Sequence, residues 1–402
     1  MKEIETCDLC GGKSFDVVTP PHSRKAFVTG SGILTLTIGA KLCRNCGFVF
    51  LSPRRDKEEL DAYYGVQSRY VKSFVELDKS EYADLCKMQI KIIKRACGTR
   101  RGNALEIGTA EGYFLHLLSK EGFQVEGVEP SVAYKQFYSK HFSKIKMHWS
   151  MLENVELPEI HYCLCVLRHV LEHFESPLSI LKHIYKLMQL DGYVYIEVPN
   201  LSRAQAAIYD YFHEEHLSYF TPQTIRYICH LAGFTCESVE EWDDNPSSSG
   251  FNYPVLRVIA RKTIDTQEET YPEYTYSHSV IADYFKRRES FFSQYIKPLE
   301  ADILSWYQIG KKLALFGGGP HTLELLNVLN IPEKVFICAF DNDSLKWGKQ
   351  IGYVPIVSPK EVNNYKPDIV VISSREFENE IAQSLHDWQD SGIKIIQIYN
   401  LI

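Results

Sequence analysis

The stretch from Ala104 to Glu129, ALEIGTAEGYFLHLLSKEGFQVEGVE, constrains the fold of this chain more than any other. It predicts a strand, a glycine turn, a helix and a second strand that ends in an acid. Gly108 and Gly112, in the pattern Glu106-x-Gly108-x-x-x-Gly112, can adopt backbone conformations that other residues avoid. Because they have no side chain, they also let a ligand approach the main chain, as the first turn of a nucleotide-binding sheet requires.

The acid at the end of this stretch fits the same interpretation. Glu129 follows Glu106 by 23 residues, where a carboxylate can accept hydrogen bonds from both hydroxyls of a ribose. The glycine spacing is not G-x-G-x-x-G, and the longer gap favours S-adenosylmethionine over a dinucleotide. We therefore predict a cofactor site that includes Glu106, Gly108, Gly112 and Glu129. The alternative is a sheet fold in which the glycines only turn corners.

The surrounding residues, 103–262, alternate strands and helices. We expect strands near residues 103–108, 124–129, 144–149, 161–168 and 192–198, with an antiparallel pair near 235–242 and 254–261. This alternation predicts an α/β fold: a mostly parallel, Rossmann-like methyltransferase core with helices on both faces of the sheet.

Four cysteines form the second strong signal. Cys7-x-x-Cys10 and Cys43-x-x-Cys46 are each followed by a glycine, and two such turns can hold one tetrahedral, closed zinc site. The 32 residues between the pairs must form a hairpin or loop, and residues 33–38 look like one of its strands. We predict structural zinc on all four thiolates. Unliganded, buried cysteines are the alternative.

The remaining segments divide the chain further. We predict a zinc-binding module at residues 1–60, a helical connector at 61–102, the cofactor domain at 103–262, a linker and long helix at 263–310, and a C-terminal α/β domain at 311–402. Within the linker, residues 263–278 are polar and read as a loop, and the helix that follows is expected to span about 279–309.

The C-terminal domain carries a second glycine loop, Gly317-x-Gly319-x-x-Thr322, with Asp341 about one strand later. Because Thr322 stands where close packing favours glycine, a dinucleotide site is weakly supported. We expect this loop to contact the phosphates or sugar of a substrate, through Gly317, Gly319 and His321. A purely structural half-fold is the third possibility.

The run VLRHVLEH brings two basic side chains to the end of a predicted strand. It contains His169-x-x-Glu172-His173, which matches a zinc-peptidase signature that needs a helix. Here an apolar strand runs directly into the motif. Because ligands of such sheets bind beyond the carboxyl ends of strands, we predict Arg168 and His169 beside the cofactor.

A charged cluster follows the next predicted strand. The segment DYFHEEHLSYF places His213, Glu214, Glu215 and His216 in four consecutive positions among aromatic residues. A carboxylate raises the basicity of a neighbouring histidine and fixes its tautomer, which suits proton abstraction near neutral pH. A sulfonium methyl needs an aligned nucleophile whose proton has been removed, on carbon or on oxygen. The alternative is a solvated, charged loop.

Charge and targeting signals limit the partners. The formal net charge is −7 and there is no long basic run, which argues against nucleic acid as the main partner. The start of the chain has no apolar targeting core, and no stretch has 18 uncharged apolar residues, so we expect a cytoplasmic protein that does not span a membrane. Eleven cysteines without an export signal are expected to be reduced.

The order of these motifs resembles the three-domain sugar C-methyltransferases, which act on nucleotide-linked keto-deoxysugars. The carriers of the resemblance are the paired Cys-x-x-Cys module, Glu-x-Gly-x-x-x-Gly, HVLEH, EVP, EHLSYF and the second α/β unit. The resemblance implies S-adenosylmethionine in the middle domain, structural zinc in the first, and a nucleotide sugar between the middle and last domains.

The same resemblance implies catalytic residues. The family segment usually reads Tyr-His-Glu-His-Leu-Ser-Tyr-Phe, so His216 matches its base and Glu215 its glutamate, while His213 stands in place of the tyrosine. A connector tyrosine also belongs to the family site, and Tyr70 is the candidate here. The departure at His213 leaves carbon and oxygen acceptors both open.

Three functions follow from these observations. The first is a methyltransferase acting on a small activated sugar, on carbon or oxygen. The second is an RNA methyltransferase that grips RNA with its zinc module, although residues 1–50 carry a surplus of only two basic residues. The third is a non-catalytic scaffold that retains the cofactor pocket.

Overall fold

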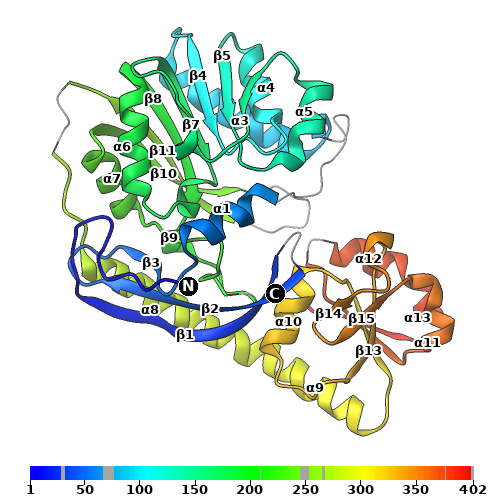
Figure 1. Cartoon of the computed structure of the whole chain (residues 1–402). Coiled ribbons are helices and arrows are strands. Elements are labelled where there is room, and N and C mark those ends of the chain that lie inside the picture. Colours follow the sequence, from blue (N-terminus) through cyan, green and yellow to red (C-terminus); the bar gives the residue numbers. More distant parts are fainter. Residues whose placement is uncertain are drawn as a thin grey trace. The chain divides into compact units, whose positions relative to one another are not determined.

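The computed structural model describes residues 1–28, 32–66, 77–208, 210–244, 253–264, 268–375 and 377–399. These residues form two compact units. The first comprises residues 1–22, 37–204 and 212–282, and the second comprises residues 23–36, 205–211 and 283–402. Figure 1 traces both units in sequence colours.

A seven-stranded sheet forms the centre of the first unit. In spatial order its strands are β10 (Phe234–Asp244), β11 (Tyr253–Lys262), β8 (Met188–Pro199), β7 (Tyr162–Arg168), β4 (Asn103–Ile107), β5 (Gln124–Val128) and β6 (Lys146–His148). The pairs among β8, β7, β4, β5 and β6 are parallel, whereas β11 is antiparallel to both β8 and β10. The Rossmann-like core and its late antiparallel pair are confirmed.

Helices cover both faces of this sheet (Figure 1). Side chains alternate between the faces of a strand, and β7 shows the consequence. Leu164 and Val166 belong to the hydrophobic cluster of α3 (Glu81–Cys97) and α4 (Tyr113–Lys120). Cys165 and Leu167 belong instead to the cluster of α6 (Pro177–Leu187) and α7 (Pro222–Leu231).

A smaller sheet follows the first cysteine pair, and one of its strands ends at Cys43. Its order is β1 (Phe15–Val28), β2 (Gly32–Cys43), β3 (Val49–Leu51) and β9 (Ser218–Tyr219). The strand expected at residues 33–38 is therefore part of β2. The last strand, β9, comes from the EHLSYF segment, so a piece of chain far along the sequence pairs with β3.

The second unit contains a six-stranded sheet. Its order is β14 (Gln350–Ile351), β15 (Val354–Val357), β13 (Phe336–Phe340), β12 (Leu313–Phe316), β16 (Ile369–Ile372) and β17 (Lys394–Gln397). All neighbours are parallel except β14 and β15. The helices in this part of the chain are α10 (Pro320–Val328), α11 (Val362–Tyr365), α12 (Glu378–Ser384) and α13 (His386–Asp390).

The long helical segment differs in two ways from the expectation. Helix α8 (Tyr274–Phe291) begins inside the stretch expected to be a loop, because Ser277, Ile281 and Tyr284 form a buried face. A π-helical segment, Phe292–Ile296, then separates it from α9 (Lys297–Gln308). Pro298 explains the interruption, because proline lacks the amide that would continue the ladder.

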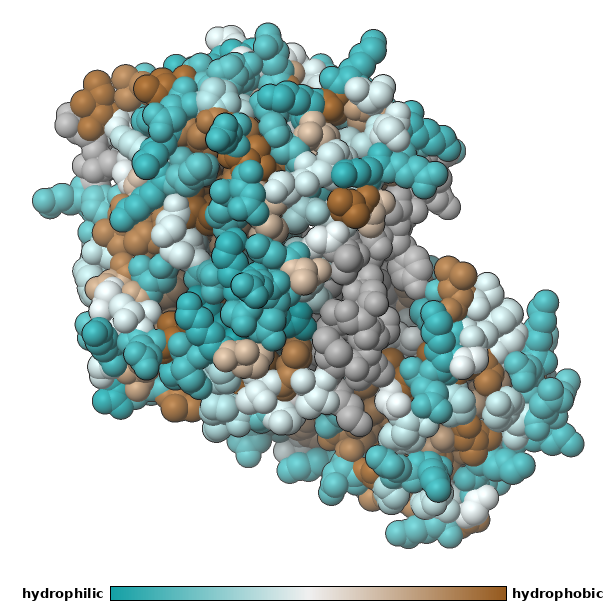
Figure 2. Space-filling model, in the orientation of Figure 1, coloured by the Kyte–Doolittle hydropathy of each residue, from teal (hydrophilic) through white to brown (hydrophobic). Residues whose placement is uncertain are grey.

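The surface is mixed in character. On the face drawn in Figure 2, hydrophobic residues are scattered among hydrophilic ones. Within the described ranges, no helix is both long enough and apolar enough to cross a membrane.

Candidate active site

The glycine turn follows β4 directly. Gly108 and Gly112 have φ angles of 72° and 77°, and Ala110 between them has a φ of 47°. A β-carbon at Gly108 would lie 2.3 Å from a methyl carbon of Val170, and one at Gly112 would lie 2.0 Å from the hydroxyl of Tyr138. Both glycines are therefore required, although the close approach here is made by the protein's own side chains.

Glu129 closes this turn from the end of β5. Its Oε2 accepts a hydrogen bond from the Ala110 amide at 2.8 Å, and its Oε1 accepts one from the Ser131 amide at 2.9 Å. Burial raises the pKa of Glu129 despite these two bonds. The carboxylate lies against the turn, at the carboxyl ends of β4 and β5, where such sheets bind their ligands.

Glu106, on β4, and Arg168, at the end of β7, lie next to the glycine turn. Arg168 Nη1 lies 3.6 Å from Glu106 Oε1, and the guanidinium lies 4.2 Å from the ring centre of Phe114. Burial, only partly opposed by Arg168, raises the pKa of Glu106 to about 8. Near the turn, the buried atoms Glu106 Oε2, Thr109 Oγ1 and Tyr138 Oη have no hydrogen-bond partner among the described residues. Buried polar atoms without hydrogen bonds destabilise the folded state. The polar groups of a nucleoside that carries an amino acid could form hydrogen bonds with these atoms.

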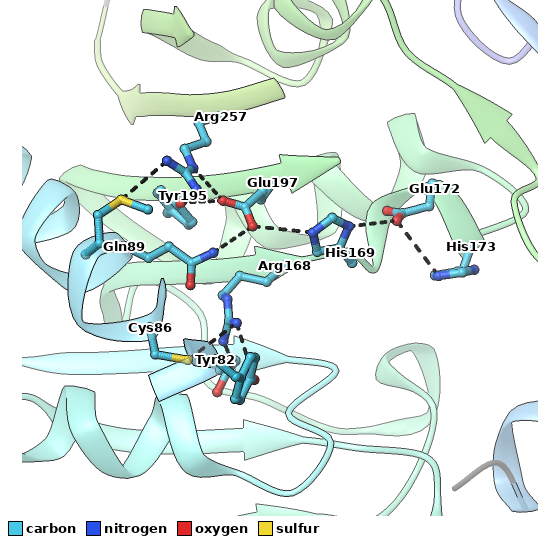
Figure 3. Close-up of polar contacts among 12 residues, drawn as sticks. Tyr82, Cys86, Gln89, Arg168, His169, Glu172, His173, Tyr195, Glu197 and Arg257 are labelled. Atoms are coloured by element: carbon cyan, nitrogen blue, oxygen red, sulfur yellow. Dashed lines mark hydrogen bonds and ion pairs between the residues drawn. The ribbon is translucent and has the colours of Figure 1, made fainter. Parts of the chain in front are cut away.

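A row of charged side chains runs from β11 across β8 to the residues that follow β7 (Figure 3). Arg257 Nε donates to Glu197 Oε2 at 2.7 Å, and Glu197 Oε1 lies 3.4 Å from His169 Nε2. Burial alone would raise the pKa of Glu197, but His169, Arg257 and Arg168 hold that pKa well below its usual range. His169 Nδ1 in turn lies 3.7 Å from Glu172 Oε1. Burial lowers the pKa of His169, yet Glu172 and Glu197 outweigh it and raise the pKa to about 9.

Three imidazoles gather at the far end of this row. Glu172 and His173 lie on η3 (Leu171–His173), immediately after β7. His173 Nε2 and His216 Nε2 lie 3.9 Å and 4.0 Å from Glu172 Oε1. The rings of His213 and His216 have centres 4.1 Å apart. A group able to accept a proton therefore lies just past the strand that neighbours the glycine turn.

Comparison with known proteins identifies the chemistry of this unit. Residues 80–239 match a family model described as a methyltransferase domain. The chain carries an S-adenosylmethionine-dependent methyltransferase domain. Residues 309–396 match a second model, described as C2185-like, N-terminal. None of the curated proteins matches this chain.

Solved structures of methyltransferases are similar at a low level. A 1,6-didemethyltoxoflavin-N1-methyltransferase from Burkholderia thailandensis, with its substrate and S-adenosylhomocysteine bound, is 14% identical over 60% of this chain and 99% of its own, with a TM-score of 0.39. An S-adenosylmethionine-dependent methyltransferase from Archaeoglobus fulgidus is 23% identical over 47% of this chain and 99% of its own, with a TM-score of 0.36. These similarities are too low to bear on substrate or mechanism.

Backbone hydrogen bonds join the segment after the N-terminal cysteines to the EHLSYF segment and to η3. The Leu51 amide donates to the Leu217 carbonyl at 3.0 Å, and the Leu217 amide donates to the Glu172 carbonyl at 2.8 Å. His216, next to Leu217, is 8% exposed. Sequence reasoning missed this arrangement, because nothing in the EHLSYF segment indicates pairing with a strand near residue 50.

Two tyrosines of α1 (Lys57–Val66) also reach this site. The Tyr63 hydroxyl donates to the Glu215 carboxylate, and the Tyr64 hydroxyl lies 3.0 Å from His173 Nδ1. The candidate from the sequence, Tyr70, lies outside the described residues. Among the described residues of the predicted connector, Tyr63 and Tyr64 are therefore the tyrosines seen to contact this cluster.

The four N-terminal cysteines come together. Sγ atoms of Cys7 and Cys46 are 3.7 Å apart, and those of Cys10 and Cys43 are 3.5 Å apart. Zinc–sulfur bonds of about 2.3 Å in a tetrahedron require about 3.8 Å between sulfurs. Each Cys-x-x-Cys turn is closed by a glycine amide that donates to the first cysteine's carbonyl at 2.9 Å. The four thiols thus fit a closed structural metal site.

The C-terminal glycine loop is built by hydrogen bonds to its neighbours. The Gly318 amide donates to Asp341 Oδ2 at 2.7 Å, and Thr322 Oγ1 donates to the Gly317 carbonyl at 2.8 Å. Gly319 precedes α10, whose His321 lines a small pocket. The pocket's other lining residues are Ala206, Ala207, Ile208, Phe291, Glu324, Arg375 and Tyr399. Gly317 and Gly319 are not among them, so of the three predicted substrate contacts only His321 faces this pocket.

Proposed function

We propose that this methyltransferase transfers the methyl group of S-adenosylmethionine to a small activated substrate, a nucleotide-linked keto-deoxysugar of carbohydrate biosynthesis. One observation carries the proposal: the imidazoles of His173, His213 and His216 converge beside Glu172, just past β7. Because β7 pairs with β4, whose end carries the glycine turn, a proton acceptor and the methyl donor would meet there.

The cofactor would occupy the ends of β4 and β5. Glu129 would accept the ribose hydroxyls, and the unpartnered oxygen of Glu106 would accept hydrogen bonds from the amino-acid portion. The turn with Gly108 and Gly112 would supply backbone contacts, and Arg168 and His169 would border the pocket. When bound, the cofactor supplies an electrophilic methyl group.

The acceptor would be activated by the His213–His216 segment. Either imidazole would remove a proton from a carbon next to a ketone or from a hydroxyl, and the resulting nucleophile would attack the methyl in line. Glu215, bound to Tyr63, would hold the segment. Zinc on the four cysteines would stabilise β3 and, through it, β9. Contact of Gly317, Gly319 and His321 with a substrate remains a prediction.

An O-methyltransferase acting on a sugar or another metabolite is a second candidate, because His213 stands where the resembling family has a tyrosine. An RNA methyltransferase is less well supported, given the net charge of −7.

The decisive experiment incubates the protein with labelled S-adenosylmethionine and a panel of nucleotide-linked keto- and hydroxy-sugars, then locates the added mass by fragmentation. Deuterium exchange next to a ketone, without methyl donor, would distinguish carbon from oxygen acceptors. His216→Ala should lower turnover by about 10²–10⁴-fold while S-adenosylhomocysteine still binds. The control, His386→Ala, changes an exposed histidine of the second unit. Unchanged turnover in His216→Ala would refute the assigned base, and absence of S-adenosylhomocysteine binding by the unaltered protein would refute the function.

A further inference from the structure

Three side chains of the active site converge on one point. Glu172 Oε1 lies 3.9 Å from His173 Nε2 and 4.0 Å from His216 Nε2, and the three ligand atoms all lie within 4.8 Å of one another. These separations are too long for direct hydrogen bonds. We propose that Glu172, His173 and His216 bind a divalent transition-metal ion, separately from the four cysteines.

The triangle has room for an ion at its centre. Because one ligand atom from each of the three residues lies within 4.8 Å of the other two, a point exists no more than about 2.8 Å from all three atoms. Zinc–nitrogen and zinc–oxygen bonds are about 2.0–2.2 Å long. Each ligand atom therefore needs to move inward by less than about 1 Å.

Glu172 gives the second, independent indication of a ligand. The residue is fully buried, and neither of its carboxylate oxygens has a hydrogen-bond partner within the described residues. His169 approaches it to only 3.7 Å, which is also beyond a hydrogen bond. A buried carboxylate without hydrogen bonds is strongly destabilising, and coordination of a cation would remove that cost.

His173 is held in the tautomer that a metal requires. Its Nδ1 lies 2.7 Å from the Glu215 carbonyl oxygen, which can only accept, so Nδ1 carries the proton. The Tyr64 hydroxyl, 3.0 Å away, lies beside the same atom. The lone pair of Nε2 is then directed towards Glu172. Histidine ligands of metals are oriented in this way, by donating their other ring N–H to a carbonyl.

The local charge also favours a cation. Glu172 Oε1 lies 3.9 Å from His173 Nε2, and Glu215, whose carbonyl lies 2.7 Å from His173 Nδ1, has a carboxylate that accepts a hydrogen bond from the Tyr63 hydroxyl. Two carboxylates therefore belong to the surroundings of His173. Two imidazoles and one carboxylate suit Zn²⁺, Fe²⁺, Co²⁺ or Mn²⁺, and they leave positions open for a substrate oxygen.

The ion would deepen the proposed function, on which this role rests. A hydroxyl bound at an open position of the ion would lose its proton more readily. A ketone oxygen bound there would instead make the proton on the neighbouring carbon more acidic. His213 would take that proton, because His216 would be a ligand. The nucleophile would then form a bond to the methyl carbon as the sulfur–methyl bond breaks, leaving S-adenosylhomocysteine.

Manganese binding tests the site without any methyl acceptor. Mn²⁺ prefers oxygen and nitrogen ligands over four thiolates, so it reports on this site irrespective of the cysteines. Electron paramagnetic resonance of free Mn²⁺ should show one ion bound per chain, displaced by added Zn²⁺. Glu172→Gln and His173→Gln should each weaken binding more than about tenfold. Glu175→Gln, three residues along, is the matched control and should bind like the unaltered protein.

The outcomes are separable from those of the methylation assay. Circular dichroism and S-adenosylhomocysteine affinity verify that each variant is folded. If Glu172→Gln does not fold, the Mn²⁺ affinity of His173→Gln tests the proposed site. The proposal is overturned if the unaltered protein binds neither Mn²⁺ nor any zinc beyond one ion per chain. Equal Mn²⁺ affinity in the unaltered protein and the folded variant would also overturn it. Either result leaves the proposed methyl transfer standing.

Discussion

Neutralising Glu197 should be among the most destabilising single changes in the first unit. Its carboxylate is fully buried and accepts from Arg257 Nε at 2.7 Å and from Gln89 Nε2 at 2.7 Å, with His169 at 3.4 Å. Glu197→Gln keeps the shape of the side chain but removes the negative charge. Arg257, which is 2% exposed, then loses its ion-pair partner in a medium of low polarity.

The magnitude follows from this burial. Removing one member of a buried ion pair costs about 3–5 kcal/mol, whereas replacing both members with apolar residues is often close to neutral. Urea unfolding followed by tryptophan fluorescence should therefore show a loss of about 3–5 kcal/mol in Glu197→Gln. The double variant Glu197→Leu, Arg257→Leu should lose clearly less.

A surface pair provides the control. Glu121 forms an ion pair with Lys94 in which both side chains are more than a third exposed. Glu121→Gln should therefore cost less than about 1 kcal/mol. If Glu197→Gln were no more destabilising than Glu121→Gln, or if the double leucine variant lost as much as Glu197→Gln, the buried charges would not be coupled as described.

Three further results are expected. The pKa of His169 is about 9 in the folded chain and 6.5 in the unfolded chain, so His169 should stabilise the fold below pH 6.5, and this contribution should be lost as the pH rises through 9. Because 35% of the side chain is exposed, we expect the contribution to the unfolding free energy to be about 1–2 kcal/mol. It is measured as the pH-dependent part of the unfolding free energy that disappears in His169→Gln. Glu129→Ala should weaken S-adenosylhomocysteine binding in calorimetry by about 1.5–3 kcal/mol, the value of hydrogen bonds to a charged group, and unchanged affinity would exclude a ribose contact. Cys43→Ser should abolish zinc retention and lower turnover while cofactor affinity persists, because β3 supports β9 and not the glycine turn; full turnover without zinc would contradict that coupling.

Local patterns were sufficient for the elements and the cofactor turn. The strands of the core and their mostly parallel arrangement were predicted from the alternation of strands and helices, and Gly108 and Gly112 have the left-handed backbone that their spacing suggested. The paired cysteines converge because each Cys-x-x-Cys turn is a local structure. These features depend on residues within one turn or one strand of each other.

Features that depend on distant contacts were beyond the sequence. The pairing of β9 with β3 joins segments about 170 residues apart, and no periodicity encodes it. Glu172 appeared in the sequence only within the HVLEH motif and without a role of its own, yet it has three imidazoles within 4.0 Å. Its place depends on how η3 packs against the EHLSYF segment. The first residues of α8, 274–278, were expected to be a loop because their polar composition concealed a buried face.

The hydrogen bond from Leu51 to Leu217 has a consequence for anyone who shortens or recombines this enzyme. A fragment that starts after the cysteine-bearing sheet would keep every strand of the large sheet but lose the edge that steadies the histidine segment. A segment exchanged between related enzymes would lose its support for the same reason unless β3 were transferred with it. The smallest part that can be transplanted is therefore discontinuous, and its two pieces are joined by backbone hydrogen bonds.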